Sequence, residues 1–111
     1  MLLDERLVDV KDKKSNERTL KDHFFKNFSK SAQYLSIRNL EFNDNVDLAI
    51  LGFGLDGHFA SIFPCHLNVN KFIDIRNEPK ILRTEEMRDP HVARLTLNLA
   101  ALSRIKNISI I

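Results

Sequence analysis

The feature that most constrains the fold is the short apolar run Val46–Leu51, which is rich in Val, Ile and Leu and ends at a Gly-Phe-Gly sequence. An apolar run of this length bounded by glycine favours a strand buried inside an α/β sheet. Ligands of open α/β sheets bind in the crevice beyond the carboxyl ends of the strands. Asp56 and His58 follow this strand on a glycine-bracketed turn, so we predict that an acid and an imidazole lie at a ligand site.

Predicted strands and helices alternate along the chain, with no internal repeat and no low-complexity linker. This alternation is typical of an α/β fold, here a partial doubly wound, mostly parallel sheet with flanking helices, in a single partial domain spanning 1–111. Ser15 or Asn16 is the expected cap of the first helix. Strands are predicted within 2–10, 46–51, 80–84, 92–97 and from 108 onward, with shorter candidates at 34–37 and 72–75; helices at 17–28, 59–63 and 99–106; and a turn at 43–45.

The same turn also satisfies a dinucleotide-binding fingerprint, which we reject. Gly52 to Gly57 reads G-x-G-x-x-G after a predicted strand, and Asp74 lies near the spacing of a ribose-binding acid. However, Asp56 inside the turn would repel a pyrophosphate, and Pro64 ends the following helix early. We therefore expect no nucleotide and no other cofactor.

Composition argues against several other classes of function. A net charge of +2 gives no strong field for nucleic acid or a membrane surface, and the basic cluster at 11–14 is interrupted by Asp12. Cys65 is the single cysteine and the histidines are scattered, so we expect neither a disulfide nor a metal site. With no signal peptide and no apolar stretch near 18 residues, the sequence predicts a cytoplasmic protein.

Three ordered motifs resemble one known family. The stretch 52–64, G-x-G-x-D-G-H-x-A-S-x-F-P, resembles the signature of the 6-phosphogluconolactonases, which are related to the glucosamine-6-phosphate deaminases and isomerases. Asp4-Glu5-Arg6 followed by Ser15-Asn16 resembles the family's "DER … SN" segment, and 94–102 resembles its later "R-x-T-L-x-L-x-x-L" segment. Ala60–Pro64 favours the lactonase, because the deaminases typically carry an Asn-Glu-Pro sequence there.

The resemblance implies a truncated Rossmann-like fold and the hydrolysis of 6-phospho-D-glucono-1,5-lactone to 6-phosphogluconate, a step of the oxidative pentose phosphate route. Imidazole titrates near neutral pH, which suits His58 to the role of general base, and the family points to the same residue. Asp56 is expected to orient His58 or to bind a sugar hydroxyl. The remaining candidates are substrate-binding: Arg6 and Arg94 for the anion, and the backbone N–H groups of the turn that includes Gly54 and Gly57 for the oxyanion.

The resemblance also leads us to expect an internal piece of a longer domain. The family's Gly-Gly-Ser phosphate loop and a later lysine have no counterpart in the sequence, so we expect little or no turnover from residues 1–111 alone. Two alternatives stay open: a sugar-phosphate deaminase or isomerase of the same superfamily, and a non-catalytic remnant. We further expect exposed sheet edges to drive self-association.

Overall fold

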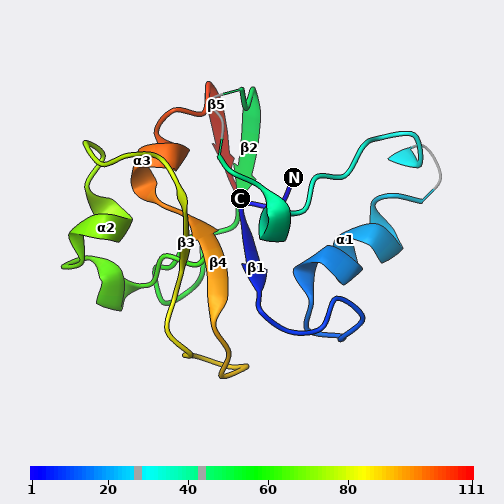
Figure 1. Ribbon diagram of the computed structural model, residues 1–111, viewed down its shortest axis with the longest axis horizontal. Coiled ribbons are helices and arrows are strands. Elements are labelled where there is room, and N and C mark those ends of the chain that lie inside the picture. Colours follow the sequence, from blue (N-terminus) through cyan, green and yellow to red (C-terminus); the bar gives the residue numbers. More distant parts are fainter. Residues whose placement is uncertain (27–28, 43–44) are drawn as a thin grey trace.

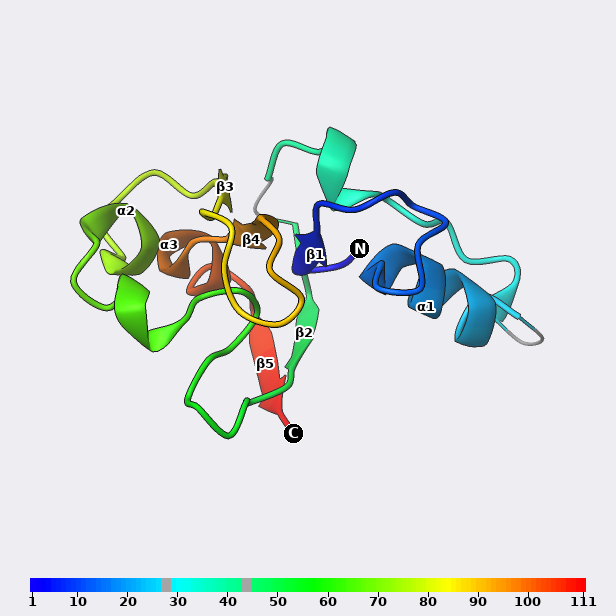
Figure 2. The same cartoon turned by 90° about the horizontal axis from the view of Figure 1, so that it is seen from below.

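The computed structural model describes residues 1–26, 29–42 and 45–111. The described chain forms two small sheets, with helix α1 (Asn16–His23) on one side of the strands. Helices α2 (Asn70–Ile73) and α3 (Leu99–Leu102) lie on the other side (Figures 1 and 2). The strands therefore lie between α1 on one side and α2 and α3 on the other.

The apolar run forms strand β2 (Leu48–Leu51), which pairs in parallel with β5 (Asn107–Ile110). Both predicted strands and the α/β class are thereby confirmed. The strand was expected to be buried on both faces, but only Ala49 and Leu51 are buried, whereas Leu48 and Ile50 remain exposed on the opposite face. The sheet therefore packs on the core through one face only.

The second sheet has three strands in the order β1 (Asp4–Arg6), β4 (Arg94–Leu97) and β3 (Ile81–Arg83). All three strands were predicted, yet both pairings are antiparallel, so the strand pairing is mixed where we expected a mostly parallel sheet. For β3 and β4 the reason is the short connection between them, because a parallel pair requires a crossover of a dozen residues or more.

Helix α1 begins where the sequence predicts it to. The side chain of Ser15 accepts a hydrogen bond from the N–H of Arg18, which satisfies one of the free donors at the helix start. The helix ends at His23, earlier than the predicted end at Phe28. Residues 27–28 and the Asn43-Asp44 part of the predicted turn lie outside the described residues.

Four other predicted elements differ from the structure. Residues 59–63 form a tight β-bridged turn instead of a helix, because Ala60 adopts a φ of 47° that no right-handed helix contains. The first half of the stretch 72–75, a candidate strand, belongs to α2. The helix predicted at 99–106 is the single turn α3, capped by Asn98. The candidate strand at 34–37 gives way to a 3-10 turn, Ile37–Asn39, and a second one spans Pro64–His66.

The core joins the elements that carry the candidate site. It is made of residues from β2, β4, the helices and the turn that follows the glycines: Ala49, Ile62, Phe72, Leu97, Ala101, Leu102 and Ile105. Ile62 and Leu97 are almost completely buried, and each contributes about 1.5–3 kcal/mol of hydrophobic stabilisation. The turn after β2 is therefore held at its far end by the core.

Candidate active site

The turn after β2 closes on itself through its backbone. The N–H of Gly57 donates to the carbonyl of Gly54 at 2.8 Å, and the N–H of Gly54 donates to the carbonyl of His58 at 2.8 Å. Gly57 has a φ of 86°, in the left-handed region that favours glycine. The two glycines predicted to bind an oxyanion thus use their N–H groups to shape the turn in this structure.

Gly54 also allows a close approach that no other residue would permit. A Cβ atom at this position would lie 2.2 Å from Nδ1 and 2.3 Å from Cε1 of His58. The same atom would lie 2.8 Å from Oδ1 of Asp56. The imidazole therefore lies directly against the backbone of Gly54, in space that a side chain would fill.

Asp56 and His58 form a hydrogen-bonded pair. Nδ1 of His58 is 2.5 Å from Oδ1 of Asp56, and the same oxygen accepts the backbone N–H of His58 at 3.3 Å. The hydrogen bond from His58 holds the pKa of the Asp56 carboxyl below its usual range. In the tautomer whose Nδ1–H donates to the carboxylate, Nε2 is the acceptor nitrogen of the ring.

The turn is anchored to β1 through a pair that sequence reasoning missed. The hydroxyl of Ser61 donates to Oδ2 of Asp4 at 2.7 Å, and the N–H of Ser61 donates to Oγ1 of Thr96 at 3.2 Å. Burial raises the pKa of the Asp4 carboxyl, and the hydrogen bond from Ser61 opposes part of that rise. The histidine-bearing turn is therefore tied to the antiparallel sheet as well as to β2.

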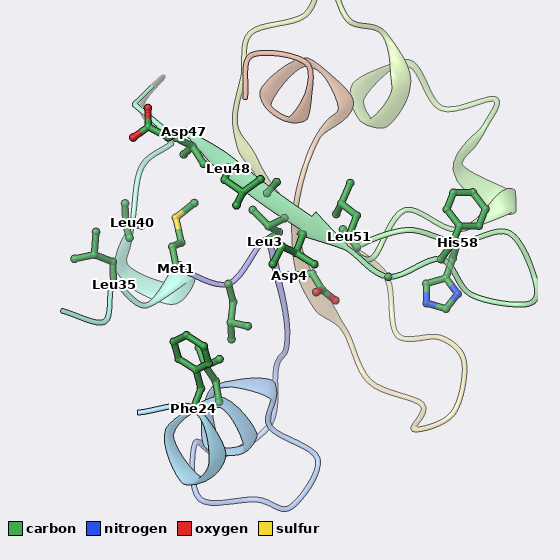
Figure 3. A pocket seen from close by; sticks show the side chains of 18 of the residues that line it. Met1, Leu3, Asp4, Phe24, Leu35, Leu40, Asp47, Leu48, Leu51 and His58 are labelled. Carbon is green, nitrogen blue, oxygen red and sulfur yellow. The ribbon is translucent and has the colours of Figure 1, made fainter. Parts of the chain in front are cut away.

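A groove of about 960 Å³ runs alongside β2 (Figure 3). His58 lies at one end of the groove, and Phe24 and Leu35 lie at the other. Asp4 also lines it, close to the carboxyl end of β2. The imidazole is 36% exposed, so it is accessible from the groove. This places the predicted base at a ligand-sized cavity, as the sequence led us to expect.

Arg6 does not reach this groove. Its guanidinium donates to the carbonyl of Lys14 at 2.9 Å and to Oδ1 of Asn16 at 2.7 Å. Its Nε is buried and has no hydrogen-bond partner among the residues that the structure describes. The structure therefore does not bring Arg6 and His58 to one cavity, and Arg6 links β1 to the start of α1.

Arg94 is buried and holds a loop in place. Its guanidinium donates to three carbonyls of the connection between β3 and β4: Met87 at 2.7 Å, Val92 at 3.2 Å and Pro90 at 3.3 Å. Desolvation lowers the pKa of Arg94, and the neighbouring charge of Arg6 adds to this effect. The three bonds assign Arg94 a positioning role for the loop 87–92.

Sequence reasoning also missed the role of Glu5, which it named only as part of a motif. Glu5 is fully buried, and its carboxylate accepts the backbone N–H groups of Asn16 and Glu17 at 2.8 and 2.7 Å. The hydroxyl of Ser15 and the N–H of Arg6 donate to it as well. A carboxylate at a helix N-terminus satisfies free donors and complements the helix dipole, so Glu5 fixes the start of α1.

Arg88 and Phe63 are two further neighbours of the site. The imidazole of His58 lies 4.9 Å from the Phe63 ring, and the guanidinium of Arg88 lies 4.9 Å from the same ring. Arg88 stands in the sequence Glu-Glu-Met-Arg-Asp, which is typical of a solvated charged loop. The sequence therefore did not indicate that Arg88 lies beside the candidate site.

Within the described ranges, no group of three or more His, Cys, Asp or Glu side chains could hold a metal ion. No helix among the described residues is long and apolar enough to cross a membrane. Cys65 is exposed, with a free thiol.

Fold and site together define an α/β protein with a histidine–carboxylate pair at the end of a parallel strand. The family model described as glucosamine-6-phosphate isomerases/6-phosphogluconolactonase matches residues 1–111, and the chain belongs to this family.

Relatives of known name agree with this assignment. The chain is 31% identical to a 6-phosphogluconolactonase of Caulobacter vibrioides, over 93% of this chain and 51% of the relative. It is 30% identical to a 6-phosphogluconolactonase of Helicobacter pylori, over 96% of this chain and 51% of the relative. The chain thus spans about half the length of the curated relatives it matches.

Solved structures give the same picture. A 6-phosphogluconolactonase from Thermotoga maritima matches with a TM-score of 0.68 and 31% identity, over 98% of this chain and 54% of that one. A putative 6-phosphogluconolactonase from Neisseria gonorrhoeae matches with a TM-score of 0.82, over 98% of this chain and 54% of that one. At 24% identity the second match establishes the fold alone.

Proposed function

We propose that this chain carries the catalytic histidine of a lactonase that hydrolyses 6-phospho-D-glucono-1,5-lactone to 6-phosphogluconate. The observation that carries the proposal is the His58–Asp56 pair at the edge of the groove, with Nδ1 bonded to the carboxylate at 2.5 Å. A carboxylate that orients an imidazole in this way prepares the other ring nitrogen to act as a general base.

In the proposed reaction, water attacks the lactone carbonyl carbon while Nε2 of His58 takes one of its protons. The tetrahedral intermediate then breaks the bond from the carbonyl carbon to the ring oxygen. His58 returns its proton to that ring oxygen, so the ring opens to an acid and a hydroxyl. Asp56 stabilises the imidazolium that forms between the two steps. A cytoplasmic location, where a sugar phosphate would be supplied, is part of the same proposal.

The proposal is tested by a lactonase assay with matched histidine variants. We expect little or no turnover from the isolated chain, and measurable turnover from a chimera in which these residues replace the matching half of the Caulobacter vibrioides relative. His58→Ala should reduce the rate by about a hundredfold or more, because general base catalysis contributes on that order. His23→Ala, an exposed histidine on α1, is the control and should leave the rate unchanged.

Two outcomes would reject the lactonase. One is a chimera whose rate does not depend on His58. The other is the release of ammonia from glucosamine 6-phosphate by the chimera, which would assign the chain to the isomerase branch of the family.

A further inference from the structure

His66 is a buried histidine that the proposed reaction does not use. It is the last residue of the 3-10 turn Pro64–His66, and it is only 5% exposed. Its Nδ1 accepts the backbone N–H of Phe63 at 3.1 Å, and its own backbone N–H donates to the carbonyl of Phe63 at 2.8 Å. The two residues therefore close the turn in both directions.

The hydrogen bond from Phe63 determines the protonation state of the ring. A backbone N–H can only donate, so Nδ1 of His66 carries no proton while this bond exists. The ring is then neutral, with its proton on Nε2. A second proton, added at Nδ1, would place two donors opposite each other. The turn therefore requires a neutral His66.

Packing prevents the ring from avoiding this conflict by a change of orientation. The imidazole stacks on the ring of the core residue Phe72, with the centroids 4.1 Å apart and the planes inclined by 7°. A half-turn about the Cβ–Cγ bond of His66 would keep this stack but would place Cδ2, which is no acceptor, opposite the N–H of Phe63. Repulsion and rotation both remove the bond that holds Phe63.

The charges that act on His66 are positive. Lys71 of α2 lies 5.2 Å from the Phe72 ring, and Arg88 of the loop 87–92 lies 4.9 Å from the Phe63 ring. Burial lowers the pKa of His66, and the charges of Lys71 and Arg88 lower it further. Beyond the Phe63 ring lie the His58–Asp56 pair and Arg94, and past the end of α2 lies Asp74, which is paired with Arg76. A proton on His66 would add a positive charge where two already act.

Phe63 connects His66 to the candidate site. The Phe63 side chain is buried, and its ring lies 4.9 Å from the imidazole of His58. Its backbone N–H is the group that His66 holds. Because the N–H and the ring belong to one residue, the bond to His66 also determines where the ring lies against His58. Loss of the bond would let that ring move.

We propose that His66 is a proton-sensitive positioning residue: its neutral form fixes Phe63 beside His58, and uptake of a proton at Nδ1 releases that contact. The contacts run from the core through Phe72, His66 and Phe63 to the imidazole of His58. The inference rests on the proposed lactonase function for its effect on turnover, but the coupling of the two histidines can be measured without a substrate.

The first measurement needs no variant. NMR signals of the ring nitrogens distinguish the two tautomers of histidine in the full 111-residue chain. In the neutral form we expect the proton of His66 on Nε2 and that of His58 on Nδ1, the opposite tautomer. As the pH falls, the amide signal of Phe63 should shift together with the ring signals of His66, with a midpoint below the ordinary 6.5.

His66→Asn separates the hydrogen bond from the proton. The side-chain oxygen of asparagine can accept the N–H of Phe63, but the amide does not titrate. We expect the amide signal of Phe63 to lose its pH dependence in this variant, and the ring signals of His58 to lose the inflection that follows His66. His23→Asn, the same change at an exposed histidine of α1, is the control and should leave both responses in place.

The pH dependence of the rate in the chimera gives a second readout. Protonation of a single general base lowers the rate by about tenfold per pH unit on the acid side. If His66 takes up a proton in the same range, the rate should fall more steeply than this, and His66→Asn should restore the slope for one group. A residue that only stabilised the fold would leave the slope unchanged.

Four results would overturn the inference: a neutral His66 with its proton on Nδ1, a Phe63 amide that does not titrate in the unmodified chain, a Phe63 response that persists in His66→Asn, or an equal loss in His23→Asn. The first two decide the question even if His66→Asn does not fold. The two proposals can fail separately, because coupled titration of the histidines in a chimera without lactonase activity would sustain the role of His66 and reject the lactonase.

Discussion

Gly54→Ala offers a sharp test of the candidate site, because the structure gives the size of the perturbation. The new Cβ would lie 2.2 Å from Nδ1 of His58, where ordinary contacts begin at 3.4 Å. The imidazole must therefore move by about 1.2 Å, the difference between these two distances. The ring is partly exposed, so it can swing away without unfolding the turn.

A displacement of this size should cost catalysis far more than stability. A misplacement of about 1 Å can cost on the order of a hundredfold in rate, so we expect a loss of that size in the chimera. The bond between His58 and Asp56 should break, and the pKa of Asp56 should then rise back toward its ordinary value of 3.8. A pH titration of the Asp56 carboxyl carbon by NMR measures this shift directly.

Gly52→Ala is the control, because a Cβ at that position meets nothing within 4 Å. Both variants make the same chemical change in the same turn, so a general effect of alanine on the backbone would appear in both. A Gly54→Ala protein with the rate and the Asp56 pKa of the unmodified protein would refute the geometry of the site.

Three other perturbations test the remainder of the structure. Glu5→Gln should lower the free energy of unfolding by about 3 kcal/mol in urea denaturation, because it removes a buried charge that several donors share. Arg76→Gln should raise the pKa of Asp74 from about 2 toward its ordinary 3.8, although the backbone N–H of residue 76 still lowers it. The ion pair stabilises the fold above pH 3.8, and NMR-monitored titration should show this contribution vanish as the pH falls through about 2. Analytical ultracentrifugation should show concentration-dependent self-association through the exposed apolar residues of β5. The double variant Ile108→Lys, Ile110→Lys should reduce this association. A monomer at every concentration would contradict the expectation.

Sequence patterns predicted the elements that local chemistry determines. The apolar run ending in glycine gave β2, and the serine before a polar helix gave the cap of α1. The pairing of Asp56 with His58 could also be predicted from the sequence, because both residues lie on one short turn. In each case the residues that decide the structure are close together in the chain.

The features that the sequence did not reveal depend on contacts between distant segments. Glu5 bonds the start of a helix more than ten residues away, and Ser61 bonds Asp4 and Thr96 on the sheet. Arg94 was a candidate for binding the substrate anion, but in the fold its guanidinium donates to three backbone carbonyls. Nothing in the local sequence distinguishes a guanidinium that the fold will satisfy from one that it will leave free.

The three-residue strand β1 couples several parts of the structure. Asp4 accepts from Ser61 in the histidine turn, whereas Glu5 and Arg6 both bond the start of α1, Glu5 through its first amides and Arg6 through the side chain of Asn16. Because consecutive side chains in a strand alternate between faces, Asp4 and Arg6 serve one side of the sheet and Glu5 serves the other. A shift of β1 by one position along β4 would exchange the faces on which these three side chains lie. Such a shift would break the contacts to the helix α1 and to the histidine turn at the same time.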